Sequence, residues 1–418
     1  MLAMKLEFPK HFFWGAATAS HQVEGGNHND WSEWEHENAD RLAHASEQAF
    51  RWNPRWQAFK PEATRMQNYI SGLACDHYHR FAADFDLAQD LGHNAHRFSI
   101  EWSRIEPREG EFNPAAIAHY QAVIAALRSR GIEPFVTLWH WTLPLWLAEQ
   151  GGICSPDFPR YFERYTAHLV KHLGMDVRFW ITLNEPEVVA SHAYLKGTWP
   201  PQKKNPYYFL VAIFRLIRAH QLAYRVIKNR FPGSSVGIAK HQIHFEIARP
   251  TLWNTLLKSF ADWTWNFFFL NRIQSTQDFI GLNHYNRNVI DNGFNKNPNR
   301  ERTDFGWEYH PESLYHALVE LIPYGKPIYV LENGIADASD ELRQKFIPAA
   351  LIALHRAIDA GALVRGYFYW SLLDNFEWDK GYWLRFGLIH VDYETQERTI
   401  RPSARAYAEV CKTNTLEI

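Results

Sequence analysis

The stretch Arg178-Phe179-Trp180-Ile181-Thr182-Leu183 is a short run of apolar and β-branched residues that ends at the polar residues Asn184 and Glu185. Seven more runs of this kind recur along the 418 residues. The full set is Phe12–Ala17, Ala95–Ile100, Glu133–Leu138, Arg178–Leu183, Ser235–Ala239, Asp278–Leu282, Pro327–Leu331 and Val364–Trp370. Amphipathic stretches separate the runs. This alternation predicts parallel strands that are joined by crossover helices.

The stretches between the runs have apolar residues at helical spacing, and several end at a glycine. They include Tyr78–Leu91 before Gly92, Ala115–Arg130 before Gly131, Arg160–Leu173 before Gly174 and Ala350–Ala360 before Gly361. We expect each helix to bury one stripe against the ring of strands and each glycine to form a left-handed cap. Eight strand–helix units predict an α/β fold, a single (β/α)8 or TIM barrel.

No shift in composition marks a domain boundary, so we expect residues 1–418 to form one domain. Two long connections, 38–72 and 286–310, follow the first and the sixth run. Loops that follow strands lie on the functional face of such a barrel, so both are expected to rim a cleft. The alternative is that they only decorate the surface.

The composition excludes several classes of protein. A net charge of −2 gives no indication of a nucleic acid or an anionic membrane as partner. The three cysteines, Cys75, Cys154 and Cys411, are too few and too far apart for a disulfide framework or a cysteine metal site. Residues 1–10 contain no apolar run typical of a signal peptide, and no stretch reaches the roughly 18 apolar residues of a membrane span. A cytoplasmic location fits best.

Two glutamates stand at the ends of apolar runs, each beside an asparagine. Glu185 follows the fourth run in Asn184-Glu185-Pro186, and Glu332 follows the seventh in Leu331-Glu332-Asn333. Strands 4 and 7 of an eight-stranded ring lie across its interior. Two carboxyls that face each other across a cleft suit cleavage of a glycosidic bond, because one must donate a proton while the other is charged. A single glutamate here would more often be a structural ion-pair member; the pair, in a chain with 18 tryptophans, favours function.

The chain resembles glycoside hydrolase family 1, the family of β-glucosidases and β-galactosidases. Thr182-Leu183-Asn184-Glu185-Pro186 matches the acid/base motif of that family, and Glu332-Asn333-Gly334 matches its nucleophile motif. The similarity runs nearly from end to end. It includes Phe13–Ser20 with Gln22, Cys75–Tyr78, Arg97–Ile100 with Trp102, Trp139–Trp141, Trp370–Trp378 and Arg385–Leu388.

The resemblance implies a retaining β-glycosidase that works through a covalent glycosyl-enzyme intermediate. In this scheme Glu332 is the nucleophile, Glu185 is the acid/base, and Arg97 and Tyr285 support the nucleophile. The implied substrate contacts are Gln22, His140, Asn184, Asn283, Trp370, Glu377 and Trp378. The expected partner is a small β-glycoside or oligosaccharide, with no metal, cofactor, nucleic acid or membrane.

The chain departs from the family pattern on the side where the leaving group binds. Glu187 stands where the family commonly has a tryptophan, so Glu187 and Phe386 are the candidate contacts to the aglycone. Thr142 replaces a common aspartate. Glu377 and Trp378 occupy the place where the phospho-glycosidase branch binds phosphate, and a carboxylate there would repel a sugar phosphate. Unphosphorylated β-glucosides, β-galactosides or β-fucosides are therefore the expected substrates.

Three other functions are open to such a sequence. A transglycosylase would use the same intermediate and pass the sugar to an acceptor other than water. A non-catalytic sugar-binding relative would typically lose one carboxylate, and both are present here. A metal-dependent barrel hydrolase would need a set of His and Asp ligands at the strand ends, and none is found.

Overall fold

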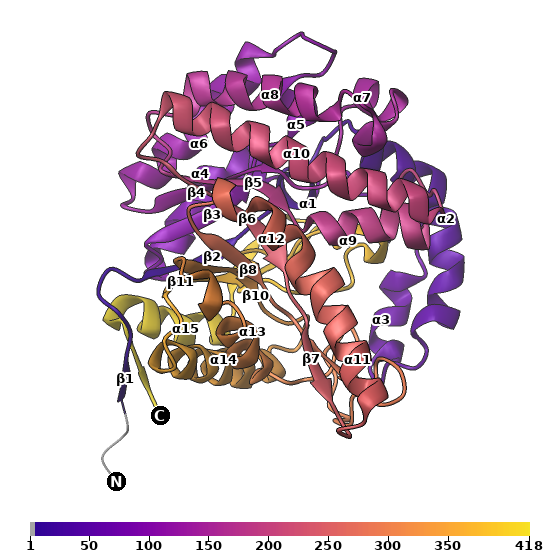
Figure 1. Ribbon diagram of the computed structural model, residues 1–418. Coiled ribbons are helices and arrows are strands. Elements are labelled where there is room, and N and C mark those ends of the chain that lie inside the picture. The colour runs from indigo at the N-terminus through magenta and orange to yellow at the C-terminus, as the bar shows by residue number, and fades with distance from the viewer. Residues whose placement is uncertain (1–4) are drawn as a thin grey trace.

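The computed structural model describes residues 5–418, in which eight parallel strands close into a barrel (Figure 1). The strands are β2 (Phe13–Ala17), β3 (Ala95–Ser99), β4 (Glu133–Trp139), β5 (Phe179–Asn184), β6 (Ser235–His241), β8 (Ile280–Asn283), β10 (Ile328–Asn333) and β11 (Val364–Trp370). The ring closes because β11 pairs with both β10 and β2. The expected α/β fold, a (β/α)8 TIM barrel, is confirmed.

Each predicted apolar run overlaps one barrel strand, and the ends differ by no more than a few residues. β6 continues past the predicted end at Ala239, since Lys240 and His241 pair with Leu282 and Asn283 of β8. Likewise β10 includes Glu332. Backbone hydrogen bonds do not require apolar side chains, so the ladder continues into the polar residues at which the apolar pattern stops.

Helices on the outside of the barrel carry the chain from one strand to the next. They are α4 (His77–Asp90), α6 (Pro114–Ser129), α8 (Phe158–Leu173), α10 (Pro206–Arg230), α12 (Phe268–Ile273), α13 (Ser313–Val319), α14 (Glu341–Asp359) and α15 (Pro402–Thr413). Asn113 and Asn205 cap α6 and α10 by accepting hydrogen bonds from amides of the first turn.

Shorter elements occupy the connections. Helical ones are α1 (Ser20–Val23), α5 (Trp102–Ile105), α7 (Leu145–Glu149), η2 (Gly152–Cys154), α9 (Pro186–Ala190), η3 (Ser191–Lys196), α11 (Leu252–Ala261), η4 (Asp262–Phe267), η5 (Gln274–Thr276), η6 (Ile322–Tyr324) and η7 (Trp378–Lys380). Three strand pairs lie outside the barrel: β1 (Lys5–Glu7) with β14 (Thr415–Glu417), β7 (His244–Ile247) with β9 (Arg287–Ile290), and β12 (Ile389–Val391) with β13 (Arg398–Ile400).

Three of the four expected glycine caps are left-handed, and one expectation is wrong. Gly92, Gly131 and Gly361 have φ values of +72°, +71° and +102°. Gly174 instead has φ −65° and continues the helical turn of α8. Close packing explains why a glycine stands at this position, because a Cβ atom at residue 174 would lie 2.2 Å from the ring of Phe231.

The connection 38–72, which was expected to be a long loop, is mostly helical. It contains the second half of α2 (Asp30–Phe50), then α3 (Trp56–Ala63) and η1 (Met66–Tyr69). Asn29 starts α2 by accepting hydrogen bonds from the amides of Trp31 and Ser32. The spacing of apolar residues did not reveal this helix, because its exposed face is long and strongly polar. The connection 286–310 is irregular apart from β9.

Aromatic side chains fill the interior of the barrel. The rings of Phe135 and Phe179 stack with centroids 4.1 Å apart, and Phe13, Tyr329 and Phe368 pack around them. This packed layer fills the middle of the barrel, so a pocket formed by the barrel strands must lie at an end of the barrel.

None of the helices within residues 5–418 combines the length and the apolar character needed to cross a membrane.

We predict that Gly15→Ala weakens the barrel, because a Cβ atom at Gly15 would lie 1.9 Å from the carbonyl oxygen of Ala95 in β3. The free energy of unfolding should fall by about 3 kcal/mol, measured by thermal or urea denaturation. Gly233→Ala is the matched control, since no atom lies within 4 Å of its added carbon. Equal stability of the two variants would contradict this account.

Candidate active site

A cavity of about 400 Å³ lies at the carboxyl ends of the barrel strands. Its volume is that of a typical small-molecule site. Six tryptophans line it: Trp141, Trp199, Trp265, Trp307, Trp370 and Trp378. Flat aromatic faces with polar groups between them suit a ligand that has apolar faces and hydroxylated edges.

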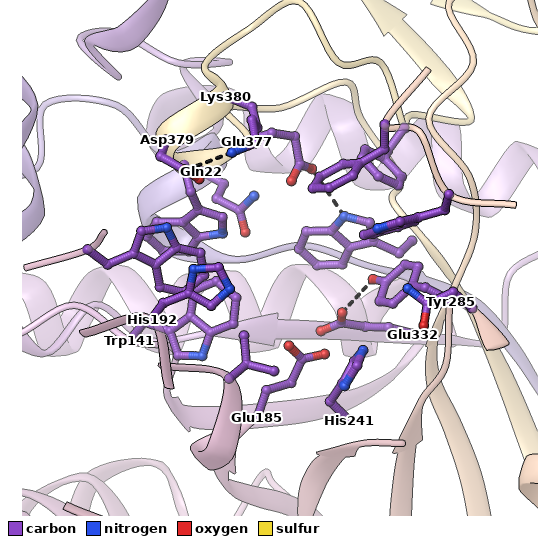
Figure 2. A pocket seen from close by; sticks show the side chains of 18 of the residues that line it. Gln22, Trp141, Glu185, His192, His241, Tyr285, Glu332, Glu377, Asp379 and Lys380 are labelled. Atoms are coloured by element: carbon purple, nitrogen blue, oxygen red, sulfur yellow. Dashed lines mark hydrogen bonds and ion pairs between the residues drawn. The ribbon is translucent and has the colours of Figure 1, made fainter. Parts of the chain in front are cut away.

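Glu185 and Glu332 both line this cavity, and their side chains point toward its centre (Figure 2). Gln22 and Glu377 enter from the opposite side. Glu332 belongs to β10. Glu185 follows β5 in the left-handed region (φ 43°, ψ 60°), and Pro186 begins α9 directly after it. The sharp strand-to-helix turn therefore places a carboxyl group at the rim of the barrel.

Glu332 is held by a cation and a hydroxyl group. Nη1 of Arg97 lies 2.5 Å from Oε1 of Glu332, and the hydroxyl of Tyr285 donates to Oε2 at 2.6 Å. Burial raises the pKa of Tyr285 well above its usual value, so its hydroxyl keeps the proton that it donates. Both oxygens of Glu332 are thus fixed, one of them by a full positive charge.

Glu185 has a different environment. Its only direct side-chain donor among residues 5–418 is a neutral amide, Nδ2 of Asn283, at 2.8 Å from Oε1. Burial, followed by the nearby charge of Glu332, raises the pKa of Glu185 from 4.5 to about 8. Glu185 is therefore protonated at neutral pH while it faces an ion-paired carboxylate.

Asn184 connects the two halves of the site from behind the cavity wall. Its Oδ1 accepts from Arg97 at 2.6 Å and from Asn283 at 3.1 Å, and its Nδ2 lies 3.0 Å from Nε2 of His140. Asn184, Asn283 and Arg97 do not line the cavity itself. In this structure they position Glu185, Glu332 and His140.

Gln22 and His140 line the cavity, and each has a polar atom without a partner within the described part of the chain. Gln22 donates from Nε2 to Asn375 and to the carbonyl of Phe376, which leaves its Oε1 unpaired. Nδ1 of His140 is also unpaired. Because burial lowers the pKa of His140 well below its usual value, and its Nε2 faces the donor Nδ2 of Asn184, the proton resides on Nδ1. The cavity therefore offers an acceptor and a donor to hydroxyl groups of a ligand.

The remaining predicted sugar contacts lie together. Trp370, Glu377 and Trp378 line the cavity, and Nε1 of Trp370 donates to Oε1 of Glu377 at 3.2 Å. Burial raises the pKa of Glu377 well above its usual value, with further increases from nearby Glu332 and Asp379. Phe386, a predicted aglycone contact, also lines the cavity.

The prediction that Glu187 contacts the aglycone is wrong. Glu187 is buried away from the cavity, and its carboxylate lies 3.3 Å from Nζ of Lys240, which is itself fully buried. Nζ of Lys240 also donates to the carbonyls of His241 and Trp265. A helical turn at the start of α9 directs Glu187 toward β6, whereas Val188 and His192 face the cavity.

Sequence reasoning missed several cavity residues. His241 and Trp265 come from β6 and η4, and Phe305 and Trp307 come from the irregular part of 286–310. That connection rims the cavity as expected, whereas 38–72 supplies none of its lining residues. Trp56 and Phe59 belong instead to a buried cluster with Trp383, and this cluster also includes the cavity residues Trp370 and Phe386.

Among residues 5–418, no group of three or more His, Cys, Asp or Glu side chains is arranged to hold a metal ion.

Comparison with known proteins agrees with this geometry. The sequence model of glycosyl hydrolase family 1 matches residues 4–269 and 255–416. The chain belongs to this family. It is 32% identical to beta-glucosidase A of Thermotoga maritima over 98% of this chain and 99% of that protein.

Solved structures of family members have the same fold as this glycoside hydrolase. The beta-glycosidase from Pyrococcus horikoshii has a TM-score of 0.87 at 35% identity, covering 99% of this chain and 96% of that one. The beta-glucosidase from T. maritima in complex with glucoimidazole also has a TM-score of 0.87, at 30% identity, covering 98% and 99%. Enzymes of the β-glucosidase and β-galactosidase family are thus its relatives.

The raised pKa of Glu185 predicts a pH-dependent cost in stability for this glycosidase. Between about pH 4.5 and 8 the unfolded carboxyl is ionised while the folded one keeps its proton, so the free energy of unfolding falls as pH rises. Glu185→Gln removes this effect and can still accept the hydrogen bond from Asn283. The variant should match the parent in melting temperature near pH 4 and exceed it at pH 9. A constant difference across this range would refute the assignment.

Proposed function

We propose that this glycoside hydrolase is a retaining β-glycosidase in which Glu332 is the nucleophile and Glu185 is the acid/base. The observation that carries the proposal is the unequal environment of two carboxyls in one cavity. Glu332 is paired with Arg97, whereas the pKa of Glu185 is about 8. One carboxylate is ready to attack and one carboxyl is ready to donate a proton.

In the first step, Glu332 attacks the anomeric carbon while Glu185 protonates the departing oxygen. Arg97 and Tyr285 hold both oxygens of Glu332, so the attacking carboxylate is already oriented. The bond to the aglycone breaks as the ester bond to Glu332 forms. The aglycone leaves as a neutral alcohol.

In the second step, Glu185 accepts a proton from water, which attacks the anomeric carbon and releases Glu332. The change of role follows from the electrostatics of the site. The charge of Glu332 is one cause of the raised pKa of Glu185, and ester formation removes that charge. The pKa of Glu185 then falls, and Glu185 becomes a base.

The polar groups of the cavity support an unphosphorylated β-glucoside, β-galactoside or β-fucoside as substrate. Gln22 and His140 offer an acceptor and a donor to sugar hydroxyls, and Trp370 offers a flat face. Glu377 and Trp378 occupy the place where the phospho-glycosidase branch of the family binds phosphate, which agrees with an unphosphorylated sugar. The T. maritima relative that binds glucoimidazole is named a beta-glucosidase, which agrees with a gluco-configured sugar. We assign Phe386 to the aglycone side and treat residues 1–418 as one catalytic domain.

A fluorinated mechanism-based substrate, 2,4-dinitrophenyl 2-deoxy-2-fluoro-β-glucoside, should trap the first intermediate. Peptide mapping should find the label on Glu332, because the fluorine slows release of the sugar from its ester. Glu332→Gln should lose the label and lower turnover of aryl β-glucosides by at least about 10³-fold. A label on any other residue would overturn the assignment of the nucleophile.

Glu185→Gln should affect substrates according to their leaving group. For a phenyl β-glucoside, kcat/KM should fall about 10²- to 10⁴-fold, whereas a 2,4-dinitrophenyl glucoside, which needs no protonation, should be cleaved at nearly the parental kcat/KM. In the parent enzyme, kcat/KM for the phenyl substrate should fall as pH rises through about 8, where Glu185 loses its proton.

Azide provides the matching test of stereochemistry. With Glu185→Gln, azide can replace water in the second step because it needs no base. Retention predicts a β-glucosyl azide product, identified by NMR. An α-azide, or an equal loss of kcat/KM for both leaving groups, would contradict the proposed roles.

A further inference from the structure

The outward face of α11 and η4 is apolar, unlike the solvent face of an ordinary surface helix. Leu252, Leu256, Phe260 and Trp263 follow one another at helical intervals and are 79%, 54%, 61% and 53% exposed. Trp253 lies beside them and is 57% exposed. Surface helices normally turn such a stripe toward the core. Here the stripe faces solvent.

A second apolar stripe continues this surface on α10. Tyr207, Leu210 and Phe214, at helical spacing, are each more than half exposed. The ring of Phe268 joins the two stripes, because its centroid lies 5.5 Å from that of Trp263 and 6.1 Å from that of Phe214. Figure 1 shows α12, which begins with Phe268, between α10 and α11.

We call the eight exposed side chains the α10–α11 surface: Tyr207, Leu210, Phe214, Leu252, Trp253, Leu256, Phe260 and Trp263. Contiguous exposed apolar side chains of this size mark a surface that binds something.

The same part of the chain is strongly basic. Residues 201–277 contain eleven Lys and Arg but only two Asp and Glu, in a protein whose net charge is −2. Carboxylates neutralise four of the eleven: Lys228, Lys240, Arg249 and Lys258. The other seven have no salt-bridge partner within the described residues. The near-zero total charge concealed this asymmetry, because an acidic excess elsewhere in the chain cancels it.

One of these cations contacts the ring that joins the two stripes. The guanidinium of Arg272 lies 3.4 Å from the ring centroid of Phe268 and 6.0 Å from that of Phe214. Arg218 is exposed one helical turn after Phe214 on the same face of α10. The surface thus combines Trp, Phe and Leu with a basic margin.

We propose that the α10–α11 surface binds an anionic lipid bilayer as a peripheral contact. Apolar side chains can enter the headgroup region while Lys and Arg pair with lipid phosphates, which is the arrangement of interfacial helices. A second copy of the chain fits less well, because two such basic surfaces would repel each other. The overall charge predicted no membrane partner; the local distribution of charge points to one.

The position of this surface relates it to the active site. Trp265, two residues after Trp263 in η4, lines the cavity, as does Ile243 next to β7. Contact with a bilayer would therefore place the mouth of the cavity beside the lipid headgroups. A glycoside with a lipid-soluble aglycone would reach the cavity from there without crossing bulk water.

Vesicle flotation tests the proposal with the intact protein. We expect binding to vesicles of 70% phosphatidylcholine and 30% phosphatidylglycerol, and binding at least about tenfold weaker for Leu256→Ser/Phe260→Ser/Trp263→Ser. The matched control, Met66→Ser/Leu73→Ser/Leu363→Ser, removes three exposed apolar side chains outside 201–277 and should bind as the parent does. Both variants should retain hydrolysis of a soluble aryl glucoside.

A charge variant distinguishes binding to anionic lipid from non-specific adsorption of the apolar side chains. Arg218→Gln/Arg272→Gln should weaken binding to the anionic vesicles several-fold, and 0.5 M salt should have a similar effect on the parent. No binding to these vesicles, or an equal loss in both serine variants, would overturn the proposal. A dimer in light scattering that only the α10–α11 serine variant dissociates would also overturn it and would assign the surface to self-association.

Discussion

The buried guanidinium of Arg97 is the interaction on which the geometry of the site depends. It donates to Glu332 of β10, to Asn184 of β5 and to Thr137 of β4, so one side chain from β3 joins three other strands of the barrel. With 1% of its surface exposed, Arg97 is shielded from solvent. A buried charge is stable only when its partners are in place. The positions of Glu332 and Asn184, and through Asn184 that of the neighbouring Glu185, are therefore coupled to the closure of the barrel.

Burial alone does not distinguish the carboxyl groups of this cavity, because Glu185, Glu332 and Glu377 are all buried. What differs is the partner. Glu332 faces a cation, Glu185 faces an amide, and Glu377 faces an indole N–H. One cavity thus gives three acidic groups three different electrostatic environments, and the pKa of Glu185 and that of Glu377 are both raised.

The barrel and the glutamate pair were predictable because both depend on local sequence patterns. These patterns are apolar runs, helical spacing and polar residues at strand ends. The failures come from contacts between distant segments. Glu187 was misplaced because its partner, Lys240, lies on β6, and Gly174 was misread because Phe231 lies against it. The helix in 38–72 and the cavity residues His241 and Trp265 had no motif to mark them. Neighbours in space, not in sequence, determine these features.

The aromatic layer in the barrel interior closes the inner end of the cavity. It is formed by Phe13, Phe135, Phe179, Tyr329 and Phe368. Substrate, alcohol and water therefore reach the cavity from the same end of the barrel. In the mechanism that we propose, the alcohol released in the first step and the water used in the second step share this end. The time that the alcohol spends there before it diffuses away therefore affects whether water or the alcohol takes the sugar.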